Sequence, residues 1–142
     1  SGARKNARKP MAVVPGGTGD VTPTHVRWTS EDNLPRICSP VSDGDLVFLL
    51  TTDGLLTCQD AAKRTKLWEH DLATECHASP CIVGDRLYVT TLAGTTHVLA
   101  VARRCEVLGR AELGEEVGAS LAFAPGRVYV RGEGSLWCLG EE

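Results

Sequence analysis

The side chains with the widest chemical repertoire in this sequence are six cysteines and four histidines. Both are zinc ligands, and an even number of cysteines can form a set of disulfides. The densest group is His70, Cys76, His77 and Cys81, but its spacing matches no usual zinc motif. We expect Cys76 and Cys81 to lie on one extended strand, too far apart for a disulfide. The interpretation is therefore free thiols, buried or half-buried, and no metal site.

Catalytic groups are equally sparse, and we assign no catalytic residue. The Gly-x-Ser-x-Gly turn that presents a nucleophilic serine is absent. The glycine-rich run 15–20 resembles a phosphate loop, but neither a Lys-Ser/Thr pair nor a helical pattern follows it, so we interpret it as a turn. We expect His97 to be packed within a strand. The acidic pairs Glu115-Glu116 and Glu141-Glu142 are interpreted as a solvated loop and a solvated terminus.

Composition indicates a soluble globular fold. Of 142 residues, 42% are hydrophobic and 23% are charged, and the net charge of -3 gives no field that would attract nucleic acid. Residues 1–10 are interpreted as a basic, flexible N-terminal segment, because they carry only basic charges: Arg4, Lys5, Arg8 and Lys9. No apolar run is long enough for a membrane span or a signal peptide, and the sequence indicates no compartment.

The elements that position these residues follow an internal repeat. Ser39-Pro40 returns as Ser79-Pro80 and in part as Ser120-Leu121, which gives a period of about forty residues. The same period relates three further sets: Asp53-Gly54, Ala93-Gly94 and Glu133-Gly134; Cys58, Val98 and Cys138; Trp28, Trp68 and Leu108. We expect the second set to occupy one repeated core site. A repeat of this length identifies one structural unit that recurs three times.

Each repeat has a β pattern. Two short apolar runs, such as 47–50 and 55–58, flank a glycine-containing turn and predict a hairpin. A short run that begins with Ser-Pro precedes each hairpin, and a further run, such as 66–69, follows it. Four strands in forty residues are typical of a propeller blade. The sequence therefore predicts an all-β propeller fragment of about three four-stranded blades.

The repeat resembles that of the pyrroloquinoline-quinone-like (PQQ-like) β-propellers. The resemblance rests on Ser39-Pro40-Val41, 44–48, 53–58, Asp60-Ala61 and Lys66-Leu67-Trp68. Two further stretches, 16–28 and 113–115, resemble the C-terminal blades of bacterial members similar to the outer-membrane assembly lipoprotein BamB. The resemblance implies that tryptophans dock one blade on the next, here through Trp28 and Trp68.

The chain departs from that pattern in two places. Arg64 stands where the family prefers glycine, and the second repeat has lost the docking tryptophan, with Leu108 in its place. Quinoprotein dehydrogenases share this repeat and hold PQQ with calcium beside an adjacent cysteine pair, which this chain lacks. We expect no cofactor; PQQ with calcium is the alternative.

The repeat also divides the chain. We predict a partial propeller over 11–142 that follows the basic segment. Because a ring of blades has no exposed sheet edge, about three blades are expected either to belong to a longer chain or to self-associate through their open edges. The expected parts are the end of one blade (11–29), two whole blades (37–71 and 77–113) and a last blade without its outer strand (118–139).

The predicted function is a non-catalytic propeller scaffold for protein binding or assembly. Loops on a rigid scaffold usually carry the binding residues. The loops that join successive blades are expected to lie on one rim, and their candidate contact residues are Arg36, Glu75, His77 and Glu116. The alternative is a fragment of a PQQ-dependent oxidoreductase.

Overall fold

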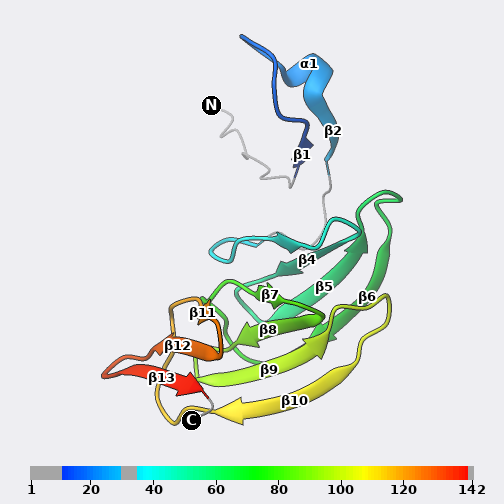
Figure 1. Cartoon of the computed structure of the whole chain (residues 1–142). Coiled ribbons are helices and arrows are strands. Elements are labelled where there is room, and N and C mark those ends of the chain that lie inside the picture. Colours follow the sequence, from blue (N-terminus) through cyan, green and yellow to red (C-terminus); the bar gives the residue numbers. More distant parts are fainter. Residues whose placement is uncertain (1–10, 30–34, 141–142) are drawn as a thin grey trace, which may run out of the picture. The chain divides into compact units, whose positions relative to one another are not determined.

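Short apolar runs between glycine-containing turns become the strands of a nearly all-β protein. A computed structural model describes residues 11–29 and 35–140, without the side chain of Trp28, and contains thirteen strands and one helix in these ranges (Figure 1). The predicted fold class is confirmed at this level. The basic segment 1–10 and the acidic pair Glu141-Glu142 lie outside the described residues. The chain divides into two units, residues 1–34 and 35–142, and each is described by itself.

The first unit is a two-stranded antiparallel sheet with one helical turn. β1 (Met11–Val13) pairs with β2 (Val26–Thr29), and α1 (Thr22–His25) lies in the segment that connects the two strands. We expected no helix after the glycine-rich run, and this was wrong, because one turn of helix follows it. Pro23 favours a helix start, and the Asp20 carboxylate accepts the first helical N–H at 3.0 Å. No described helix is a candidate for a membrane span.

The second unit contains three antiparallel sheets in which neighbouring strands follow one another in the sequence. Their strand orders are β3-β4-β5-β6, β7-β8-β9-β10 and β11-β12-β13. We call them the first, second and third sheets. Their strands are β3 (Val41–Ser42), β4 (Leu46–Leu50), β5 (Leu55–Asp60), β6 (Lys66–Asp71), β7 (Cys81–Val83), β8 (Arg86–Thr90), β9 (Thr95–Ala100), β10 (Val107–Glu112), β11 (Ala122–Ala124), β12 (Arg127–Arg131) and β13 (Leu136–Gly140).

The first and second sheets stack face to face and share one hydrophobic core (Figure 1). Phe48, Leu56 and Cys58 of the first sheet are completely buried in this core, as are Leu87 and Leu99 of the second. Full burial of such an aliphatic or aromatic side chain contributes roughly 1.5–3 kcal/mol. This interface therefore anchors the stack.

The outer strand of each complete sheet contains a one-residue bulge that changes the register of the repeat. Trp68 on β6 pairs with Cys58, whereas on β10 the residue paired with Val98 is Gly109. The forty-residue period placed Leu108 at the tryptophan position, and this assignment was wrong. The connection before β10 is one residue longer than that before β6, so Leu108 falls at the unpaired bulge position, 48% exposed.

The six cysteines are all free, but their burial differs. Cys58 is buried, while Cys138, two repeats later, is exposed because it lies on β13 at the edge of the third sheet. The expectation of one repeated core site was therefore wrong at Cys138. Cys76 was also misplaced, because it lies in the connection between β6 and β7 and not on one strand with Cys81. Cys38 and Cys76 are buried, Cys81 is half-buried and Cys105 is exposed.

Candidate interaction surface

The loops that join successive sheets lie against the hairpin turns of both neighbouring sheets. We use the name rim for these connecting loops (72–80 and 113–121), the hairpin turns (51–54, 91–94 and 132–135) and the segment before the first sheet (35–40). Backbone hydrogen bonds connect one rim loop to the next. The N–H groups of Cys76, Leu92, Val117 and Glu133 donate to the carbonyls of Thr52, Glu75, Leu92 and Glu116, at 2.8, 2.7, 2.9 and 2.9 Å respectively.

Glycine is required at the two turns where the rim loops approach most closely. Gly54 and Gly94 have φ of +93° and +82°, a region that disfavours L side chains. A Cβ at Gly54 would also collide with the carbonyl oxygen of Thr74, and one at Gly94 with that of Glu115. The repeated glycine thus serves two purposes: it permits the turn, and it allows the next connection to lie on it.

At the third turn a carboxylate supplies the contact. Glu115 accepts hydrogen bonds from the N–H of Gly134 at 2.8 Å and from the indole N–H of Trp137. These bonds lower the pKa of Glu115, and the bond from Trp137 has a larger effect than that from Gly134. Sequence analysis interpreted Glu115 as part of a solvated loop, and this was wrong, because its half-buried carboxylate fastens the last hairpin to the rim.

The structure places the four predicted contact residues in rim loops but pairs only two of them. His77 Nε2 lies 2.8 Å from Glu75 Oε1, and both side chains are partly exposed. Arg36 is exposed near Asp53, whose pKa is lowered mainly by a hydrogen bond from Thr51 and to a smaller degree by Arg36. Glu116 is exposed, and its backbone carbonyl is one of the rim acceptors. Their role in binding remains a prediction.

A ladder of serines links the inner ends of the three sheets, which sequence analysis did not anticipate. The Ser39 N–H donates to the Ser79 hydroxyl at 2.8 Å, and the Ser79 N–H donates to the Ser120 hydroxyl at 2.9 Å. The signal was present in the recurrence of serine every forty residues. That recurrence established the period but not the hydrogen bonds, because a β pattern does not reveal which side chains face the neighbouring repeat.

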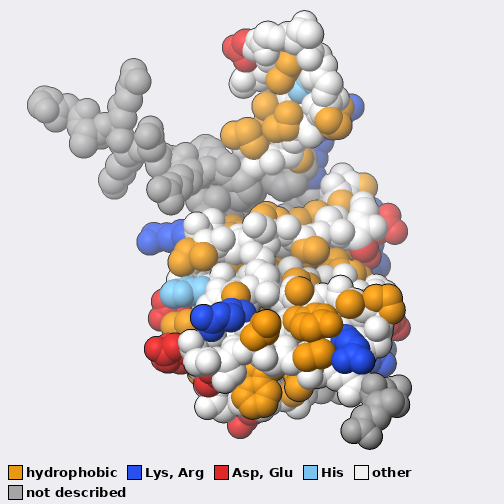
Figure 2. Space-filling view, turned by 60° about the vertical axis from the view of Figure 1, so that its left-hand side comes forward, with side chains coloured by type: hydrophobic (Ala, Val, Ile, Leu, Met, Phe, Trp, Pro, Cys, Tyr) orange, Lys and Arg blue, Asp and Glu red, His pale blue; other side chains and the backbone are white. Residues whose placement is uncertain are grey.

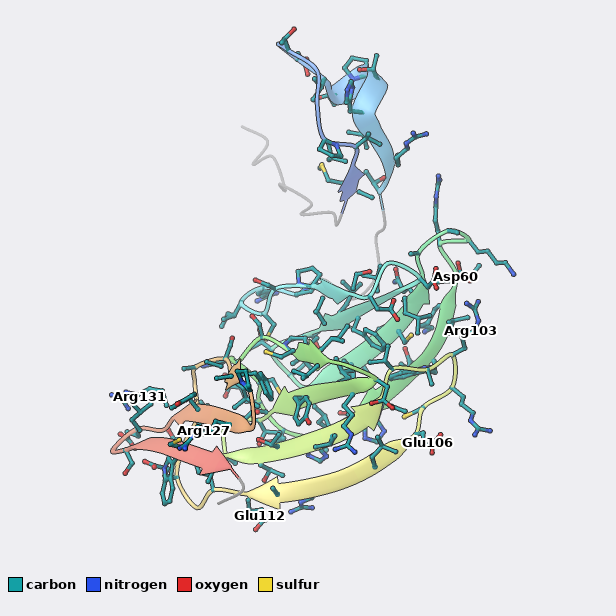
Figure 3. All side chains as sticks on the ribbon, in the orientation of Figure 1. Asp60, Arg103, Glu106, Glu112, Arg127 and Arg131 are labelled. Atoms are coloured by element: carbon teal, nitrogen blue, oxygen red, sulfur yellow. The ribbon has the colours of Figure 1, made fainter. Side chains whose placement is uncertain are left out.

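The ends of the sheets opposite the rim are fastened by different groups. The indole N–H of Trp68 donates to the Ala102 carbonyl at 3.0 Å, so this tryptophan links the first sheet to the loop between β9 and β10. Asp60 and Arg103 form an ion pair between the same two segments (Figure 3). This pair lowers the pKa of Asp60. The side chain of Trp28, the other predicted docking residue, is not described.

The described part of the chain offers no cluster of metal ligands, and its two most strongly shifted thiols are poor nucleophiles. No three His, Cys, Asp or Glu side chains within residues 11–29 and 35–140 gather into a possible metal set. Burial raises the pKa of Cys58 to about 11 and that of Cys76 to about 12, so both thiols are protonated and weakly nucleophilic at neutral pH. Burial, followed by the charges of Arg110 and His70, lowers the pKa of His97.

The repeat and the stacked sheets match a known family model over residues 20–104, more than half of the chain. The model is described as outer membrane protein assembly factor BamB. The chain belongs to this family. The recognised resemblance is therefore confirmed, and the match includes the first complete sheet and nearly all of the second up to the loop that precedes β10.

Solved structures confirm the propeller fold. BamB from Moraxella catarrhalis is 23% identical, with a TM-score of 0.65 over 84% of this chain and 35% of its own. The β-propeller domain of Myceliophteria thermophila Cps50 (Swd1) is 16% identical, with a TM-score of 0.69 over 94% of this chain and 49% of its own. The computationally designed Ika8 protein is 13% identical, with a TM-score of 0.62 over 82% of this chain and 36% of its own. The chain thus spans between a third and a half of these structures. No curated protein matches.

The BamB family repeat also explains a strained residue. Arg64, which stands where the family prefers glycine, has a φ of +61° in the turn between β5 and β6. This left-handed conformation costs an L residue roughly 1–2 kcal/mol. The family's glycine is therefore a conformational requirement of this turn, which the present chain meets with a strained arginine.

Proposed function

We propose that the chain is a non-catalytic scaffold that binds a protein partner through the rim. The observation that carries this proposal is the continuous series of backbone hydrogen bonds from Thr52 to Glu133, which fixes the rim loops relative to one another. A surface that is ordered before binding loses little conformational entropy when a partner docks. The rim is therefore suited to recognition by shape and charge.

The exposed side chains of the rim supply the recognition chemistry. Arg36 offers a positive charge, Glu116 a negative one, and Glu75 with His77 a hydrogen-bonded carboxylate and imidazole. Membership in a family described as an assembly factor supports a partner that is itself a protein. The partner surface would carry complementary charges of both signs.

A matched pair of variants tests the proposal. The immobilised chain captures proteins from an extract of its source cells, and the affinity of each purified captured protein is then measured by titration calorimetry. One variant replaces four rim residues by alanine, and the control replaces four exposed charged residues outside the rim. The rim set is Arg36, Glu75, His77 and Glu116; the control set is Lys63, Glu69, Arg104 and Glu106.

We expect the rim variant to bind the captured protein at least tenfold more weakly, about 1.4 kcal/mol or more, and the control variant to bind within about twofold of wild type. Equal thermal melting of the three proteins verifies that folding is not the cause. Equal affinity of the rim variant and wild type would refute the proposal, as would the capture of nothing beyond what blank beads retain.

A second copy of the chain is the other partner to be tested. Within the described residues β13 pairs only with β12, so its outer edge offers unpaired backbone groups. Self-association through this edge would produce a mass in solution that is a multiple of the 15.2 kDa chain. A monomeric mass from a well-folded sample excludes this form of association and leaves the rim proposal intact.

We propose further that the scaffold acts without a quinone or calcium. The described residues do not fit a metal-held quinone, since they offer no cluster of possible metal ligands. Addition of PQQ and calcium is expected to produce neither a stoichiometric complex nor dye reduction. A tight complex with redox activity would favour the alternative, an oxidoreductase fragment.

A further inference from the structure

A cavity of about 180 Å³ lies between the second and third sheets and is partly open to solvent. Its wall is almost entirely apolar. Side chains of both sheets and of the loop between them contribute to the wall, including Tyr88, Val98, Ala111, Leu121, Val128 and Leu139. The first and second sheets, by contrast, enclose a continuous core. The cavity is thus a property of the second interface.

The second repeat lacks the tryptophan of the first at a strand position next to two wall residues of the cavity, Val98 and Ala111. In the first sheet Trp68 follows the bulge of β6, pairs with Cys58 and packs against the core that faces the second sheet. Gly109 has the same place in β10, paired with Val98 on the cavity wall. A Cβ built on Gly109 would meet no atom within 4 Å. A side chain at Gly109 would therefore meet open space on the face of the sheet that carries the wall residues Val98 and Ala111.

The walls favour an aromatic guest. In the first interface the rings of Phe48 and Trp68 lie 5.9 Å apart at a tilt of 54°. Tyr88 has the place of Phe48 one repeat later, and the ring of Phe123 lies 4.9 Å from it at a tilt of 55°. A ring bound beside Tyr88 would reproduce the tilted aromatic pair of the first interface, a geometry that adds roughly 0.5–1.5 kcal/mol to burial alone.

Two polar side chains of the wall, Thr96 and Glu112, are already paired. The Thr96 hydroxyl lies 2.9 Å from that of Thr90, and Glu112 accepts from Arg110. An enclosed apolar cavity of about 150 Å³ stays dry and binds benzene, and the present cavity, although partly open to solvent, has a similarly apolar wall. We propose that this cavity binds a small apolar aromatic molecule, between benzene and indole in size. The proposal is independent of the rim and of any protein partner.

Titration of the whole chain with indole tests the proposal, with calorimetry for affinity and NMR for position. We expect saturable binding of one indole per chain and shifts of the Tyr88 and Leu139 signals. Gly109→Trp would place an indole in the cavity and lower the affinity at least tenfold. Leu108→Trp, which adds the same group at the exposed neighbouring position, is the control and is expected to bind within about twofold of wild type.

A second substitution keeps the test decisive if Gly109→Trp fails to fold. Ala111→Leu also enlarges a wall residue of β10 and is expected to weaken indole binding, while a bulkier probe such as pyrene is expected not to bind to wild type. The proposal is wrong if indole shows no saturable binding to the wild-type chain. It is also wrong if the folded Gly109→Trp or Ala111→Leu protein binds indole as wild type does, or if Leu108→Trp is the variant that blocks it.

Discussion

The two interfaces between successive sheets are built from the same repeat but are packed differently. In the first, Phe48, Cys58 and Trp68 form one row across three paired strands and meet the second sheet in a continuous core. In the second, the corresponding row is Tyr88, Val98 and Gly109, and a cavity remains beside it. One lost tryptophan thus separates a closed interface from an open one.

The difference continues onto the third sheet. The strand position held by Leu46 in the first sheet is held by Arg86 and Arg127 in the next two, and Leu50 gives way to Thr90 and then Arg131. Figure 3 labels Arg127 and Arg131 on the third sheet, and Figure 2 shows a face of the molecule on which basic and hydrophobic side chains lie together. The sheet face that carries Phe48 in the first sheet, Tyr88 in the second and Tyr129 in the third therefore becomes more polar from the first sheet to the third.

The largest contrast is expected in thiol reactivity. Cys58 lies in the closed row, and burial raises its pKa to about 11, so roughly one thiol in a thousand is ionised at pH 8. Cys138, its counterpart on the open third sheet, is exposed. Iodoacetamide at pH 8 should label Cys138 at least about a hundredfold faster than Cys58, as measured by mass spectrometry of peptides. Comparable rates would show that the first interface opens readily.

Truncation of the aromatic residue in each row should lower the unfolding free energy more in the first interface than in the second. Phe48 is completely buried, and Phe48→Ala is expected to cost about 4 kcal/mol of unfolding free energy. Tyr88 is half-buried beside the cavity, so Tyr88→Ala should cost about 2 kcal/mol. Chemical denaturation of both variants gives the comparison. Equal costs would contradict the view that the second interface is the looser one.

Both interfaces share the rim, and substitutions of two glycines test how much the close approach of its loops contributes to stability. Gly54→Ala introduces both an unfavourable backbone conformation and a collision with Thr74, and we expect a loss of about 3 kcal/mol. Gly44 has a similar φ of +104° with open space around it, so Gly44→Ala should cost only about 1 kcal/mol. If thermal melting shows equal losses, the close approach of the rim loops contributes nothing.

The ion pair between Asp60 and Arg103 fastens the first interface only, since Ala100 has the place of Asp60 in the second sheet. Because folding lowers the pKa of Asp60 below 3.8, its stabilising effect is complete above the unfolded pKa and disappears as the pH falls through the folded one. Asp60→Asn should therefore be less stable than wild type at pH 7, with the difference narrowing below about pH 4. Denaturation at a series of pH values measures this, and a constant difference would argue against the pair.

The smallest effect is expected at the strained turn of the first sheet. Arg64→Gly relieves the left-handed arginine and should stabilise the protein by about 0.5 kcal/mol, because part of the gain is offset by the greater freedom of glycine when unfolded. Arg104→Gly, at an exposed position in a loop with no positive φ, serves as the control and should not stabilise. A loss of stability in Arg64→Gly would show that the arginine side chain contributes more than its backbone costs.

Sequence reasoning predicted the period and the hairpins, because short apolar runs and turn glycines report local structure directly, and the resemblance of the repeat to a known one supplied the family. It misassigned Leu108 because one extra residue before β10 shifts the register, and a period counted along the chain does not reveal a bulge. It also missed the role of Glu115, whose partners Gly134 and Trp137 lie in the next hairpin. Both failures concern contacts that depend on where the backbone pairs, which residue types alone do not specify.

The serine ladder has a direction. Ser39 gives its N–H to Ser79, and Ser79 gives its own to Ser120, so every repeat donates to its successor and accepts from its predecessor. Such a series of bonds has the same direction at each step, as in a head-to-tail assembly. A repeat inserted between two others would restore both bonds without any change in its neighbours, whereas a repeat joined in the opposite sense would bring donor to donor. The two bonds of the ladder therefore require the same orientation of all three repeats.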